Sequence, residues 1–129
     1  MTATVLVVED TPANMKLVAM LLRREGYDVL QAWSAEEAIE IARAQRPALV
    51  LMDMQLPGLD GLAATRVLKS DAATRDMPVI AVTALAMSGD EERIRAAGCD
   101  GYVAKPIRYK EFLHEVAKVL PAPGRRAAT

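Results

Sequence analysis

The chain has 129 residues, the usual length of one domain; 52% of them are hydrophobic but only 4% are aromatic, which predicts an aliphatic core. The net charge is −1 with acids and bases interspersed, which argues against a nucleic-acid-binding surface. A single cysteine excludes an internal disulfide. The N-terminus lacks signal-peptide features, and no apolar run approaches the roughly 20 residues of a membrane span. We therefore expect a cytoplasmic protein that binds neither nucleic acid nor membrane.

Short apolar runs alternate with amphipathic segments along the chain, which predicts alternating strands and helices. Capping residues mark the helix starts: Thr11 stands before Pro12, residues 34–37 and 88–91 form capping boxes, and Asp60 is spaced to cap a third helix. We expect strands over residues 4–8, 28–32, 48–53, 79–83 and 101–104, and helices beginning near residues 12, 35, 61, 88 and 109.

Apolar residues at helical spacing predict which side of each helix faces the core. The predicted inward residues are Met15, Val18, Ala19 and Leu22; Ala38, Ile39 and Ala42; Ala63, Ala64, Val67 and Leu68; and Tyr109, Phe112, Leu113, Val116, Ala117 and Leu120.

The regular alternation predicts an α/β fold with a parallel sheet and helices on both faces. The five-stranded flavodoxin-like order 2-1-3-4-5 is the natural topology for it. Residues 1–120 would form the single domain, and residues 121–129, rich in Pro, Gly and Ala, would be a flexible tail.

Polar side chains stand at the carboxyl ends of the predicted strands, where ligands bind in open parallel sheets. A buried apolar run leads straight into Asp53. The alternative role for Asp53 is to cap the next helix, but Asp60 is better spaced for that role. The other strand ends carry Glu9 and Asp10, Thr83 followed by Ala84, and Lys105.

Carboxylates gathered at one edge repel one another unless they are protonated or a cation lies between them. Oxygen ligands with room for water suit Mg²⁺, an aspartate can act as a nucleophile towards phosphorus, and a lysine can bind phosphoryl oxygens. Neither a catalytic Ser/His/Asp or Cys/His set nor a Gly-rich phosphate loop is present. These residue types indicate a chain that receives a phosphoryl group and does not bind a nucleotide.

Four short motifs in order carry a resemblance to a known family: Val-Val-Glu-Asp at 7–10, Asp-Met-Gln-Leu-Pro-Gly-Leu-Asp-Gly at 53–61, Val-Thr-Ala at 82–84 and Lys-Pro at 105–106. Over residues 4–120 the chain resembles the receiver domains of two-component response regulators. The stretch 87–102 is similar to single-domain regulators of the DivK type, and also to receiver modules of hybrid histidine kinases.

The resemblance assigns roles to individual residues. Asp53 would accept the phosphoryl group, and Asp10, Asp53 and the backbone carbonyl of Gln55 would ligate Mg²⁺, with Glu9 acting through a water. Lys105, Thr83 and Ala84 would bind the phosphoryl group, and the Lys105–Pro106 bond would be cis. Thr83 and Tyr102 would form the switch pair, although Tyr102 also fits an ordinary half-buried strand position.

The expected function is a phosphorylation-dependent switch rather than an enzyme, one that catalyses only its own phosphorylation and dephosphorylation. A sensor histidine kinase or histidine phosphotransfer protein would donate the phosphoryl group. Output would pass to a downstream protein through the fourth helix, fifth strand and fifth helix of a monomer or a weak phosphorylation-dependent dimer. One alternative is a receiver module cut from a hybrid kinase or multidomain regulator. A second is an aspartyl-phosphate phosphatase, which is disfavoured because Gln55 is no general acid. A third is a flavin-binding module, which is disfavoured because Glu9 and Asp10 would repel its phosphate.

The first helix leaves two interpretations open for Leu17 and Leu21, which lie beside its core stripe. They form either an exposed strip on which a phosphodonor helix docks, or part of a wide buried arc. We expect His114 to be a surface residue, Cys99 to be buried and unreactive, and Trp33 to be partly exposed.

Overall fold

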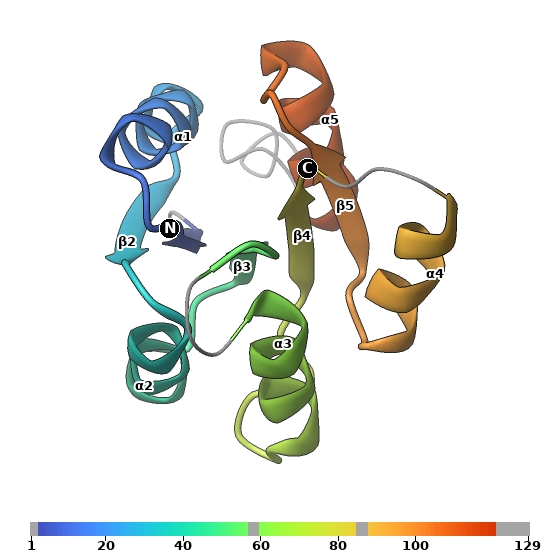
Figure 1. Cartoon of the computed structure of the whole chain (residues 1–129). Helices are drawn as coiled ribbons and strands as arrows, with labels where there is room; N and C mark the ends of the chain where they lie inside the picture. The colour runs from blue at the N-terminus through green and yellow to red at the C-terminus, as the bar shows by residue number, and fades with distance from the viewer. Residues whose placement is uncertain (1–2, 57–59, 85–87, 121–129) are drawn as a thin grey trace.

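Five parallel strands form one sheet in the order β2-β1-β3-β4-β5, which confirms the predicted topology (Figure 1). The computed structural model describes residues 3–56, 60–84 and 88–120, without the side chains of 88–90. Its elements are β1 (Thr4–Val8), α1 (Pro12–Arg24), β2 (Asp28–Ala32), α2 (Ala35–Gln45), β3 (Leu49–Asp53), α3 (Gly61–Ser70), β4 (Val79–Thr83), α4 (Ser88–Ala96), β5 (Gly101–Ala104) and α5 (Tyr109–Val119).

The three central strands are buried on both faces, because helices cover each side of the sheet (Figure 1). Alternate residues of each strand enter two separate cores. One core contains α1 and α5 side chains such as Leu22 and Phe112, and the other contains α2, α3 and α4 side chains such as Ala38, Leu68 and Ile94. The sheet therefore holds the ends of β1, β3 and β4 rigidly at one edge.

The helix caps follow the predictions at two of the positions that the structure describes. Ser34 Oγ accepts a hydrogen bond from Glu37 N at 3.1 Å, and Asp60 Oδ1 accepts one from Ala63 N at 2.8 Å. The prediction for Thr11 is wrong in part, because it occupies the N-cap position without a side-chain cap bond. The capping box at residues 88–91 lies largely outside the described side chains.

Most predicted core residues are buried, but Ala63 and Leu113 are only half-buried and three others are exposed. Val67 and Tyr109 are 37% and 46% exposed, and Ala117 is exposed as well. Val67 and Tyr109 lie at the margins of the buried stripes of their helices, and their side chains stay open to solvent. An apolar residue at helical spacing predicts burial only where another element packs against that face.

Asp71 ties the end of α3 to α2. Its Oδ2 accepts a hydrogen bond from Arg43 Nε at 2.6 Å, and its Oδ1 accepts one from Ala73 N at 2.9 Å. The Ala73 bond and then the Arg43 bond lower the pKa of Asp71 below its ordinary value of 3.8.

This lowered pKa predicts a pH-dependent loss of stability on replacing Asp71. A depressed carboxyl pKa stabilises the fold fully above the ordinary value, and the contribution disappears as the pH falls through the folded-state pKa. We expect Asp71→Asn to unfold at lower urea concentration than the native chain at pH 6, and the difference to shrink on acidification below pH 3.8. Urea titrations of both chains from pH 6 to 3 measure this difference in stability. A difference that stays constant with pH would contradict the lowered pKa of Asp71.

No helix among the described residues is long and apolar enough to cross a membrane. The predicted tail at residues 121–129 lies outside the described residues, so the domain boundary at residue 120 stays a prediction.

Candidate functional site

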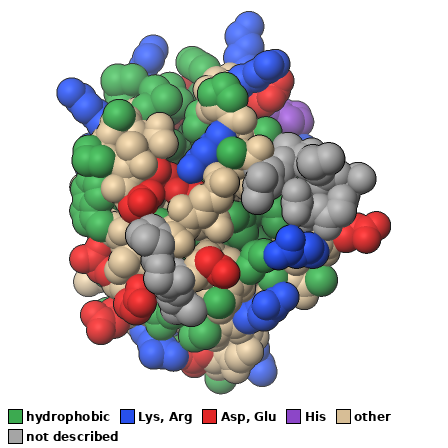
Figure 2. Space-filling model, in the orientation of Figure 1, with side chains coloured by type: hydrophobic (Ala, Val, Ile, Leu, Met, Phe, Trp, Pro, Cys, Tyr) green, Lys and Arg blue, Asp and Glu red, His purple; other side chains and the backbone are tan. Residues whose placement is uncertain are grey.

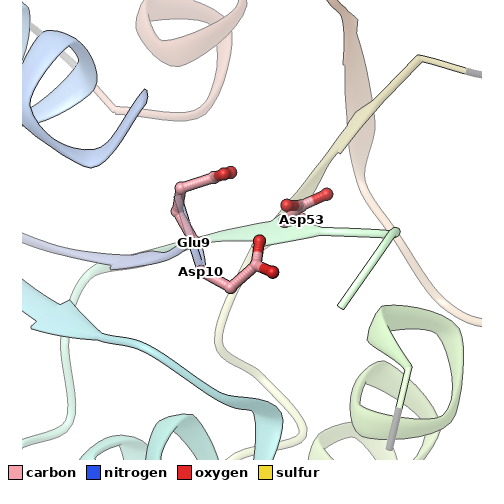
Figure 3. Close-up of side chains that lie close together, drawn as sticks. All are labelled: Glu9, Asp10 and Asp53. Carbon is pink, nitrogen blue, oxygen red and sulfur yellow. The ribbon is translucent and has the colours of Figure 1, made fainter. Parts of the chain in front are cut away.

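Three carboxylates from the ends of β1 and β3 meet at the edge of the sheet. Glu9, Asp10 and Asp53 each offer an oxygen within 4.8 Å of the others. Figure 3 shows the three side chains arranged around one small space. Asp53 is only 1% exposed and Glu9 4% exposed, whereas Asp10 faces solvent. Because β3 is buried along its whole length, Asp53 cannot move away from this position.

Lys105 brings a cation from the end of β5 to the same place. Its Nζ lies 3.1 Å from Asp53 Oδ1 and 3.7 Å from Glu9 Oε2. Its backbone N donates to the carbonyl oxygen of Thr83 at 2.8 Å, which continues the pairing of β4 with β5. The following bond to Pro106 is cis, as the resemblance implied.

The two oxygens of Asp53 have different surroundings. Oδ1 accepts a hydrogen bond from Gln55 N at 2.9 Å in addition to its contact with Lys105. Oδ2 is buried and has no hydrogen-bond partner among the described residues. A buried carboxylate oxygen without a partner is costly, and the Asp53 carboxylate as a whole lies close to two further acids.

This arrangement fits a hard divalent cation. Burial, and then the neighbouring Asp53 carboxyl, raise the pKa of Glu9 above its ordinary value of 4.5. A cation among the three carboxylates would reverse that effect by favouring their charged forms. The oxygen-only donor set, with Asp10 open to solvent, leaves room for the waters that Mg²⁺ keeps.

Thr83 and Ala84 stand at the adjacent strand end. Thr83 is buried as the last residue of β4, and Ala84 N donates to the side-chain Oε1 of Gln55 at 3.2 Å. Tyr102 is half-buried on β5 and packs against the core formed with α2, α3 and α4. The structure thus unites Glu9, Asp10, Asp53 and Lys105 at the cluster, and it places Tyr102 within β5, in register with Ala81 of β4.

Three features of the site escaped the sequence analysis. Asn14 Nδ2 donates to Glu9 Oε1 at 3.2 Å, where Thr11 N also donates at 3.3 Å, so the start of α1 orients this acid. The side-chain Oε1 of Gln55 accepts a hydrogen bond from Ala84 N, a contact that the residue pattern did not predict. Gly61 packs so closely that a Cβ there would lie 2.3 Å from the carbonyl oxygen of Asp53. Of these three features, only the Asn14 contact had a signal in the sequence, which is a polar residue in the first turn of the helix that follows Glu9.

Of the two interpretations left open for Leu17 and Leu21, the structure favours the wide buried arc at Leu21. Leu21 is 5% exposed and belongs to the core between α1, α5 and the sheet, whereas Leu17 is 37% exposed. The buried arc of α1 is wide, because it includes Leu21 in addition to the predicted stripe of Met15, Val18, Ala19 and Leu22. The large exposed apolar residues of α1 are instead Leu17 and Met20.

Three other residues behave as expected. His114 is exposed on α5, Trp33 is 42% exposed, and Cys99 is buried. Burial raises the pKa of the Cys99 thiol above its ordinary value of 9.0, which makes it a poor nucleophile.

The sequence profile of the response regulator receiver domain matches residues 5–117. The chain belongs to the response regulator receiver domain family. The DivK polar-differentiation response regulator of Brucella ovis is 48% identical over 120 residues, which are 93% of this chain and 98% of that protein. The DivK regulator of Brucella anthropi is 47% identical over 120 residues, which are again 93% of this chain and 98% of that protein. This receiver domain therefore acts in two-component signalling and is similar to single-domain regulators.

Solved receiver domains share the fold. The receiver domain of the sensor histidine kinase PA1611 from Pseudomonas aeruginosa superposes with a TM-score of 0.85 at 36% identity, covering 92% of this chain and 98% of that one, and it has a magnesium ion coordinated in its active-site cleft. Vibrio cholerae CheY4 gives a TM-score of 0.88 at 23% identity, covering 93% of this chain and 100% of that one, and confirms the fold.

Proposed function

We propose that this receiver domain accepts a phosphoryl group on Asp53 from the phosphohistidine of a kinase or phosphotransfer protein, in a Mg²⁺-dependent reaction in the cytoplasm. The observation that carries the proposal is the environment of Asp53. One oxygen accepts from Gln55 N and contacts Lys105, the other is buried without a partner among the described residues, and the carboxylate lies close to Glu9 and Asp10. The magnesium ion in the PA1611 receiver domain supports the same metal here.

The residues divide the chemistry among them. Asp10, Asp53 and the Gln55 carbonyl would hold Mg²⁺, with Glu9 acting through a water, and the bound metal would neutralise phosphoryl charge. Asp53 Oδ2 attacks phosphorus while the bond from phosphorus to the donor imidazole nitrogen breaks, and its electron pair stays on that nitrogen. Lys105 places a positive charge beside the new phosphoryl oxygens. Burial of Asp53 keeps bulk water away from the acyl phosphate.

The contact between Gln55 and Ala84 links phosphorylation to the switch. In the unmodified chain the Ala84 N–H donates to Gln55 Oε1, so this donor is already in use. We expect the phosphoryl group to take over the Ala84 N–H together with the Thr83 hydroxyl. Tyr102 would then turn inward and bias the face formed by α4, β5 and α5 towards a downstream protein.

A phosphatase based on an aspartyl-phosphate intermediate is less well supported. Such an enzyme needs a proton donor near the acceptor, and position 55 is an amide whose oxygen already accepts a hydrogen bond. The chain is similar both to single-domain DivK regulators and to the receiver domain of the sensor histidine kinase PA1611, and the proposed phosphoryl transfer to Asp53 applies equally to either setting.

Small-molecule phosphorylation tests the assignment. With acetyl phosphate and Mg²⁺ we expect the native chain to gain one phosphoryl group by intact mass spectrometry, and we expect chelation with EDTA to prevent this. Asp53→Asn should gain no phosphoryl group, because an amide oxygen is a poor nucleophile and because the substitution removes one carboxylate ligand of the metal. Asp60→Asn is the matched control, since Asp60 only caps α3, and should be phosphorylated normally. Phosphorylation of Asp53→Asn would refute the assignment.

A further inference from the structure

A groove of about 660 Å³ lies between α1 and the end of β2. Met20 and Trp33 provide its exposed apolar surface, the buried Ala19 of α1 also lines it, and Lys16, Arg23 and Arg24 supply its charges. Nothing in the proposed phosphorylation chemistry uses these residues. The groove therefore needs an explanation of its own.

Its apolar side chains are unusually open to solvent. Met20 is 46% exposed and Trp33 is 42% exposed. The backbone at Trp33 is held in place, because its N–H donates to Glu37 Oε1 at 2.6 Å at the start of α2. An exposed tryptophan on an anchored backbone, beside a methionine, is typical of the centre of a protein-binding surface.

The charge of the groove has one sign. Its lining includes Lys16, Arg23 and Arg24 but no acidic residue, and within the described part of the chain none of the three forms an ion pair. Figure 2 shows basic and hydrophobic side chains next to one another over α1, at the upper left. On a chain of net charge −1, three unpaired cations around an apolar surface form a local positive field.

We propose that this α1–β2 groove docks an acidic amphipathic helix or peptide of a partner protein. Apolar side chains of the partner would cover Trp33 and Met20, and its carboxylates would pair with Lys16, Arg23 and Arg24. Residues 121–129 of this chain contain Arg125 and Arg126 and no acid, so the same charge would repel them. The apolar surface and the small number of cations favour a protein over a nucleic acid.

Trp33 is the only tryptophan, so its fluorescence reports directly on the groove. The probes are designed helical peptides that present Leu with Glu, Leu with Lys, or Ser with Glu at positions i, i+3 and i+4. We expect the Leu/Glu peptides to shift the Trp33 emission in a saturable, salt-sensitive way, and the other two sets to do so at least about tenfold more weakly. A flat titration with the Leu/Glu peptides, or equal binding of the Leu/Lys peptides, would overturn the proposal.

Charge reversal supplies the matched comparison. Arg23→Glu with Arg24→Glu should weaken Leu/Glu binding by about tenfold or more, whereas Arg66→Glu, exposed on α3, should leave it unchanged. Circular dichroism and phosphorylation by acetyl phosphate should stay normal in all these variants, which separates failure of the groove from failure of the phosphorylation site. Saturable binding of duplex DNA that the reversal abolishes, or self-association that it abolishes, would overturn the assignment of an acidic protein partner.

Discussion

Replacing Gly61 with alanine is expected to damage the fold and the phosphorylation site together. A Cβ at this position would lie 2.3 Å from the carbonyl oxygen of Asp53, 2.8 Å from Met54 Cα and 2.9 Å from Met54 Cε. Two of these neighbours are backbone atoms of the strand end and loop that carry the acceptor, so the chain must shift to remove the clash. We expect a loss of about 1–3 kcal/mol in the free energy of unfolding, even though alanine is favoured over glycine within a helix.

The same shift should weaken Mg²⁺ binding and slow phosphorylation by acetyl phosphate, because both depend on the position of Asp53. Gly101→Ala is the matched control. Its Cβ would meet Glu115 Oε1 at 3.4 Å and Ile80 Cγ1 at 3.8 Å, which are ordinary contacts. We expect this control to retain native stability within about 0.5 kcal/mol. Urea titration and Mg²⁺ titration of both variants measure these effects. Native stability and native Mg²⁺ binding in Gly61→Ala would contradict the prediction and show that the loop after β3 accommodates a Cβ.

Removing the charge of Lys105 is expected to make the metal-free chain less stable and its metal affinity higher. Lys105 Nζ is the one cation within 4 Å of both Asp53 and Glu9 among the described residues, and its side chain is only 19% exposed. In Lys105→Met the carboxylates repel one another without compensation, which we expect to cost about 1–3 kcal/mol of unfolding free energy. Mg²⁺ then enters a more negative site, so its affinity should rise roughly three- to tenfold.

Lys118→Met controls for loss of a surface charge. Lys118 pairs with Glu115 at 2.8 Å on α5, but its side chain is 58% exposed, so solvent screens the pair. We expect this variant to keep its stability and its Mg²⁺ affinity. Thermal unfolding with increasing Mg²⁺ measures both quantities, since a ligand that binds the native state raises the transition temperature. Weaker Mg²⁺ binding by Lys105→Met would mean that Lys105 organises the metal site rather than competes with the metal.

The sequence predicted the sheet order and the acidic cluster because both follow from local patterns. Buried apolar runs define the central strands, and parallel strands place their carboxyl ends at one edge, so Glu9, Asp10 and Asp53 had to meet. Lys105 followed by the same argument from β5. These inferences needed only the strand assignments and the alternation of strands with helices.

Features that depend on packing between elements could not be predicted in this way. Leu21 and Val67 each lie at the margin of a helical stripe, and only the neighbouring elements decide that the first is buried and the second exposed. Arg46 ends α2 with a φ of 48°, a left-handed position at which glycine or asparagine would have been the expected residue. The contacts made by Asn14 and the Gln55 side chain depend on side-chain directions that residue spacing does not fix.

Transfer of a labelled phosphoryl group tests the central claim most directly. A histidine kinase or phosphotransfer protein carrying labelled phosphohistidine is mixed with the native chain, with Asp53→Asn and with Asp60→Asn, each with and without Mg²⁺. We predict that the label moves to the native chain and to Asp60→Asn only with Mg²⁺, and that peptide mapping places it on Asp53. Label that stays on a competent donor in the presence of the folded native chain, or that appears on His114 or on Asp53→Asn, would contradict the account.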